Sequence, residues 1–93
     1  MDDQTILNLA KINLGLSTTA YDQYLTMLIA AAKAAIIEEG IELDLTAEQD
    51  DNLVIMYTAY LWRKRKEDVG MPRMLRYALN NRLLSQQGGS VNG

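Results

Sequence analysis

The side chains best suited to binding another molecule form a run of four cations after the single tryptophan, Trp62-Arg63-Lys64-Arg65-Lys66. Guanidinium and ammonium groups bind carboxylates and phosphates, and arginine can do so through two parallel hydrogen bonds. Cations also suit the negative end of a helix dipole, where they keep a helix terminus solvated. The run therefore indicates either a docking surface for an acidic partner, with Trp62 as an apolar anchor, or a soluble helix end.

A second charged segment runs from residue 38 to residue 51 and contains seven carboxylates and no basic residue. Such a cluster could bind calcium, but the spacing does not follow the calcium-loop pattern and the central glycine is absent. A solvated helix start is the favoured interpretation, and an acidic interface or channel surface is the functional one. The residues concerned are Glu38, Glu39, Glu42, Asp44, Glu48, Asp50 and Asp51.

Catalytic groups of the common kinds are missing from the sequence. The chain has no histidine and no cysteine, so the commonest general base, the thiolate nucleophile and the usual zinc ligands are unavailable. No partner groups surround the carboxylates as a hydrolase would need. We therefore expect no enzymatic activity, no metal and no cofactor.

The charge is distributed unevenly along the chain. Residues 1–62 hold two basic and ten acidic side chains, whereas residues 63–93 hold seven basic and two acidic ones. The total is −3 and the sequence pI is about 4.7, which argues against a strongly basic nucleic-acid binder. A molecule polarised in this way can attract copies of itself head to tail.

Helical periodicity dominates the elements that would position these groups. We expect helices over residues 3–14, about 20–39, about 47–67 and 72–85, with Gly15 and Gly40 as terminators and Thr46 to Gln49 as a capping box. Residues 41–45 alternate apolar and acidic side chains, which predicts a short extended crossing over the core. The prediction is one all-α domain, residues 1–85, built as a small bundle of three to four helices, with a polar tail at 86–93 that is ordered only on assembly.

The start of the chain is acidic where a signal peptide would be basic, and no apolar run reaches the length of a membrane-spanning helix. We accordingly expect no membrane partner and a protein that stays in the cytoplasm of the cell that makes it.

Three segments together resemble one known family. These are the helix Tyr21-Asp22-Gln23-Tyr24-Leu25-Thr26-Met27-Leu28-Ile29-Ala30-Ala31-Ala32 with its exit at Glu39-Gly40-Ile41, the segment Tyr57-Thr58-Ala59-Tyr60-Leu61-Trp62-Arg63-Lys64-Arg65, and the segment Gly70-Met71-Pro72-Arg73-Met74-Leu75-Arg76. Their layout is similar to the head-tail connector (adaptor) proteins of tailed bacteriophages, over nearly the whole chain up to about Leu84.

That resemblance implies a structural virion protein of the phage neck, made in the host bacterial cytoplasm. It would form a homo-oligomeric ring, usually of twelve copies, below the portal protein, and would join the head to the next neck or tail-completion protein. DNA would pass through the channel without sequence-specific binding. Carried onto this chain, the surfaces meeting neighbours or neck partners include Trp62 to Lys66 together with Met71, Pro72, Arg73 and Arg76.

The alternative interpretation is a small helical DNA-binding regulator that uses the basic fourth helix. Its candidate base-reading and phosphate-binding side chains are Arg73, Arg76, Asn80, Asn81 and Arg82. The acidic total disfavours this reading.

Overall fold

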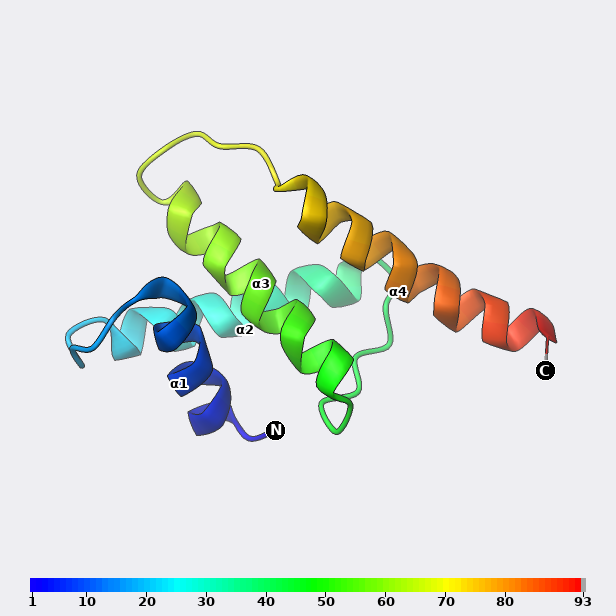
Figure 1. The fold of residues 1–93 in the computed structure, drawn as a ribbon, viewed down its shortest axis with the longest axis horizontal. Helices are drawn as coiled ribbons and strands as arrows, with labels where there is room; N and C mark the ends of the chain where they lie inside the picture. Colours follow the sequence, from blue (N-terminus) through cyan, green and yellow to red (C-terminus); the bar gives the residue numbers. More distant parts are fainter. Residues whose placement is uncertain (93) are drawn as a thin grey trace.

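The computed structural model describes the backbone of residues 1–92 and the side chains of residues 1–87. Within these residues the chain forms four helices and no strand (Figure 1): α1 Asp3–Leu14, α2 Asp22–Glu38, α3 Glu48–Lys64 and α4 Arg73–Asn92. The predicted all-α fold is confirmed.

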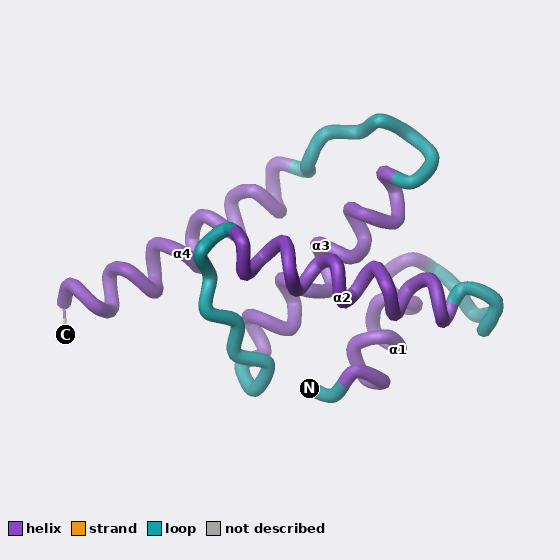
Figure 2. Tube along the Cα trace, turned by 180° about the vertical axis from the view of Figure 1, so that it is seen from behind, coloured by secondary structure: helices purple, strands orange, loops and turns teal. Residues whose placement is uncertain are grey.

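Helix α3 lies at the centre of the molecule. It packs against α1, α2 and α4, and α2 crosses it on the side that faces the viewer in Figure 2. Buried apolar side chains from all four helices and from the 41–45 segment form one core. The largest of them that are fully buried are Ile6, Leu25, Ile36, Ile41, Val54, Leu75 and Leu79. The second half of α4 extends beyond the body of the bundle (Figure 1).

The ends of α1 follow the sequence signals. The carboxylate of Asp2 accepts a hydrogen bond of 2.8 Å from the Thr5 amide, which satisfies a donor that the first helical turn leaves unpaired. Gly15 ends the helix in the left-handed conformation at φ 71°. After α2, Gly40 adopts φ 99°, so the predicted glycine terminator is confirmed there too.

The segment between α2 and α3 is extended, as the alternating pattern predicts. Ile41 is buried and Leu43 and Leu45 are half-buried, whereas Glu42 and Asp44 are exposed. The predicted capping box that follows is wrong. Ala47 is the N-cap residue of α3, and the hydroxyl and amide of Thr46 instead bond to the Asp44 carboxylate.

Two further boundaries differ from the prediction. Helix α3 ends at Lys64 rather than near residue 67, and residues 65–72 form the connection to α4. Helix α4 begins at Arg73, directly after Pro72, and continues to Asn92 rather than ending at Ser85. The backbone of the predicted polar tail is thus helical from residue 86 to residue 92, while its side chains from residue 88 and residue 93 itself lie outside the described part.

Candidate interaction surface

Helix α3 carries opposite charges at its two ends. Exposed cations occupy its last turn and the residues that follow, at Arg63, Lys64, Arg65 and Lys66. Exposed carboxylates lie at its start and in the preceding loop, at Glu48, Glu42 and Asp44. A helix of 17 residues separates these ends by roughly 25 Å. Figure 1 shows the two connecting loops at opposite ends of the helix.

Three cations at the end of α3 and the start of α4 have neither an ion-pair partner nor an aromatic ring in contact among the described residues: Arg63, Lys66 and Arg73. We call these three residues the basic end. By contrast, the Arg65 guanidinium lies 3.7 Å from the Trp62 ring centroid, and the Lys64 ammonium lies 5.7 Å from that of Tyr60. Those two cations are partly held by aromatic rings of their own chain.

Trp62 is half-buried in a cluster of aromatic rings. Its ring centroid lies 5.2 Å from that of Tyr21 in an edge-to-face arrangement and 6.1 Å from that of Tyr24. These contacts join the end of α3 to the start of α2, so Trp62 has a role inside the molecule. Tyr57 and Tyr60, which the helical spacing assigns to the core, are buried.

Arg76 and Glu39, both predicted to lie at interfaces, bind each other. Each terminal nitrogen of Arg76 donates a 3.0 Å hydrogen bond to one carboxylate oxygen of Glu39. This bidentate contact lowers the pKa of Glu39 and raises the pKa of Arg76. It joins the first turns of α4 to the end of α2, so neither group is presented as a free charge.

Arg82 binds a buried carboxylate and the loop that precedes α3. It donates hydrogen bonds of 2.6 and 3.1 Å to the two oxygens of Asp50, and one of 2.8 Å to the Glu42 carbonyl. Asp50 is 1% exposed and also accepts a 2.8 Å bond from the Asp44 amide. The hydrogen bond to Asp50 is the main cause that raises the Arg82 pKa.

The sequence interpretation missed this contact because it treated Arg82 only as a possible DNA ligand. The signal was available, since Leu75, Leu79 and Arg82 recur at helical spacing and so share the inward face of α4.

Asp51, next to Asp50, is also buried. Its Oδ2 lies 3.9 Å from the amino group of Met1, which also bonds to the Leu45 carbonyl. The predicted solvated helix start is therefore wrong at Asp50 and Asp51, because both carboxylates lie inside the molecule. Glu38, Glu42, Asp44 and Glu48 remain exposed.

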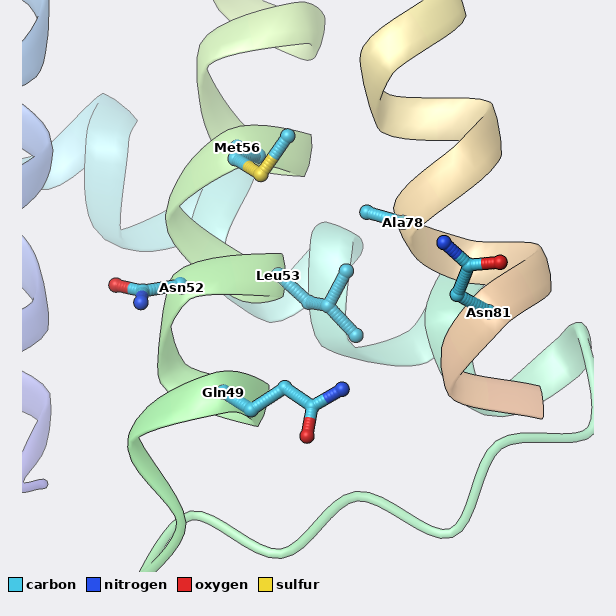
Figure 3. Close-up of a pocket in the computed structure, with 6 residues that line it drawn as sticks. All are labelled: Gln49, Asn52, Leu53, Met56, Ala78 and Asn81. Carbon is cyan, nitrogen blue, oxygen red and sulfur yellow. The ribbon is translucent and has the colours of Figure 1, made fainter. Parts of the chain in front are cut away.

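The grooves beside α4 offer no reactive groups. One groove, between α3 and α4, has the apolar side chains of Leu53, Met56 and Ala78 together with three amides, from Gln49, Asn52 and Asn81 (Figure 3). A second groove lies next to the 65–72 connection, where Pro72 is exposed and Met71 is half-buried against the core, and Arg63 lines it as well. A lining of amides, apolar groups and one guanidinium suits contact with a protein surface rather than proton transfer.

Comparisons with known proteins give no relative. No protein-family model, no curated protein and no solved structure matches this chain. Among the described residues, no three Asp or Glu side chains are grouped so as to hold a metal ion. None of the helices there is long and apolar enough to cross a membrane.

Proposed function

We propose that this chain is a structural protein of a bacteriophage neck. By analogy with the family it resembles, twelve copies would assemble into a ring below the portal and would join the head to the next neck or tail-completion protein. The ring would extend the channel through which DNA passes.

The observation that carries this proposal is the separation of exposed opposite charges along α3. The basic end lies at the terminus of α3 and the exposed carboxylates lie about one helix length away. A ring with head-to-tail contacts needs two different, complementary surfaces on each subunit, and a polarised subunit supplies them. The basic end would meet carboxylates of a neighbour or of a neck protein.

The contacts of two arginines disfavour the alternative function as a DNA-binding regulator. Arg76 and Arg82, two of its five candidate ligands, are bound to Glu39 and Asp50 of the same chain. Using them on DNA would leave Asp50 buried without its cation, which is strongly unfavourable.

Assembly can be tested on the purified chain. We expect native mass spectrometry and negative-stain electron microscopy to show closed rings, either unaided or after addition of the portal protein encoded in the same genome. A chain that stays monomeric with the portal present would overturn the proposal. A gel shift that weakens steeply with salt would favour the DNA-binding alternative instead.

A further inference from the structure

Helix α2 is apolar on two opposite faces. Leu25, Ile29, Ala32 and Ile36 are buried in the core. The opposite face is exposed to solvent and carries no charge along a stripe that we call the α2 stripe, consisting of Met27, Ala30, Ala34 and Ile37. Met27 is 64% exposed and Ile37 is 57% exposed. Because helices that are apolar all round are normally buried, this face calls for a partner.

Lys33, the one charged residue between the first and the last residue of α2, does not interrupt this stripe. Its ammonium group turns toward α1 and binds the Asp3 carboxylate at 2.9 Å. In Figure 2, α2 lies in front of the bundle, with no other helix covering it from that side.

Helix α4 presents a second exposed stripe. Met74, Tyr77 and Leu84 are 73%, 55% and 62% exposed, and Asn81 between them is exposed as well. We call this set the α4 stripe: Met74, Tyr77, Asn81 and Leu84. The inward side of the same helix is formed by Leu75 and Leu79, so the α4 stripe cannot be covered by its own bundle.

The two stripes have the same spacing. Their members are separated by three, four and three residues, which is the spacing of the contact seam between paired helices. When α2 and α4 are placed antiparallel, four layers form together. The layers pair Met27 with Leu84, Ala30 with Asn81, Ala34 with Tyr77, and Ile37 with Met74. The largest side chain of the α4 stripe thereby faces an alanine, which lets the helices approach closely.

The charges next to the stripes complement each other in the same arrangement. Glu38 directly follows the α2 stripe and Arg73 directly precedes the α4 stripe, so an antiparallel pairing brings them to one end of the seam. Both are exposed, and neither has an ion-pair partner in the described part of the chain. Pairing α2 antiparallel with α2 of another copy would instead place Glu38 opposite the uncharged Thr26.

We propose that the α2 stripe of one copy binds the α4 stripe of a second copy as an antiparallel helix pair. Each subunit then uses α2 toward one neighbour and α4 toward another, which is a head-to-tail contact. The two stripes themselves support this interface, which we call the seam. The further step, that such contacts close into a ring, rests on the proposed function.

Crosslinking tests the pairing directly, because the chain contains no cysteine of its own. We expect a short thiol-to-thiol crosslinker to join Ala30→Cys with Asn81→Cys when the two variants are mixed. Each variant by itself should stay uncrosslinked, and so should a mixture of Ser17→Cys, on an exposed loop, with Asn81→Cys. Efficient crosslinking of Ala30→Cys with itself would overturn the proposal in favour of α2 pairing with α2, and no crosslinking in the mixture would overturn it as well.

A charge placed within the seam gives an independent measurement. Ala34→Arg should raise the dissociation constant of self-association by about 100-fold or more, since it buries an unpaired charge. The matched control, Asn8→Arg on the exposed face of α1, should leave it unchanged. Circular dichroism should show both variants folded, because both sites face solvent in the isolated subunit. Self-association of Ala34→Arg like that of the unaltered chain would overturn the seam.

Different results would contradict the α2–α4 seam and the proposed neck function. Rings that survive Ala34→Arg would reject the seam and leave the neck function standing. A seam confirmed by crosslinking in a particle of only two copies would support the pairing and reject the ring.

Discussion

The guanidinium of Arg82 binds both carboxylate oxygens of Asp50, a residue 32 positions earlier that is 1% exposed. The pair connects the start of α3 to the middle of α4, and through the Glu42 carbonyl it also holds the extended segment between α2 and α3. The basic part and the acidic part of the sequence therefore neutralise each other in part within one molecule.

Arg82→Met should lower the free energy of unfolding by about 3–5 kcal/mol, because it leaves the Asp50 carboxylate buried without a cation. Urea denaturation measures this value. The double variant Arg82→Met with Asp50→Asn should be less destabilised than Arg82→Met, since it removes the buried charge as well. Arg73→Met, which breaks no ion pair, should change stability by no more than about 0.5 kcal/mol. A similar small change for Arg82→Met would contradict the structural role of the pair.

The Glu39 and Arg76 contact should make stability depend on pH. Arg76 holds the pKa of Glu39 below its ordinary value of 4.5, so the ionised form is favoured in the folded state. The resulting stabilisation is present above pH 4.5 and is lost as the pH falls through the lower folded-state pKa. The unaltered chain should be more stable than Glu39→Gln at neutral pH, with the difference vanishing in acid. Thermal unfolding from neutral to acidic pH measures this. Glu67→Gln, which removes a carboxylate at an exposed site without breaking an ion pair, is the matched control. A pH-independent difference for Glu39→Gln would count against the contact.

Trp62→Ala should destabilise the isolated subunit by roughly 3 kcal/mol, because it removes the ring that packs against Tyr21, Tyr24 and Arg65. Tyr77→Ala is the control, since this exposed ring has no aromatic partner in the described part of the chain and should cost less than about 0.5 kcal/mol. Guanidinium unfolding followed by circular dichroism compares the two. Equal stabilities would mean that Trp62 acts only at an interface.

Gly40→Ala should lower stability by about 1–2 kcal/mol, because φ at this position is 99° and a β-carbon disfavours the left-handed conformation. The new methyl group would lie 3.6 Å from Leu83, an ordinary contact, so the cost comes from the backbone. Gly70→Ala is the matched control, since Gly70 lacks a positive φ and has open space around it. It should be neutral or slightly stabilising. Equal effects of the two substitutions in urea denaturation would reject the argument.

Reversing charge at the basic end should weaken assembly without unfolding the subunit. The double variant Arg63→Glu with Lys66→Glu tests this without changing Arg65. Arg65 is left unaltered because it also packs on Trp62 and its loss would disturb the fold. We expect fewer rings by electron microscopy and an unchanged helical spectrum. Glu67→Lys with Asp68→Lys, a reversal of the opposite sign in the same loop, serves as the control. Unchanged assembly of the first variant would remove the basic end from the proposed contact.

The helices could be predicted from sequence because apolar periodicity and glycine terminators act locally. The bounds of α1 and the extended segment after Gly40 follow from such signals. The start of α3 could not be predicted in the same way, since Thr46 has two possible partners and bonds to Asp44 rather than capping the helix. That choice depends on Asp44 being held next to Asp50, a contact made only in the folded chain.

For the charged residues of the candidate surface, too, the sequence predicted local features but not contacts between distant segments. The sequence places Arg63, Lys66 and Glu48 on exposed helix ends, and all three are exposed, although Lys66 lies in the connection that follows α3. It could not separate Arg73, which is unpaired, from Arg76 and Arg82, which bind carboxylates far away in sequence. Both stripes consist of residues that read as ordinary helix surface until the core-facing sides of α2 and α4 are known.

The burial of Asp50 constrains when this chain can fold during its synthesis. While a ribosome is still making α4, Asp50 has no cation to accompany it into the interior, and the start of α3 must stay in contact with water. The core can close there only after Arg82 has emerged, although α1, α2 and α3 have already been translated. Folding of this helical bundle should therefore be completed only after the middle of α4 has been translated.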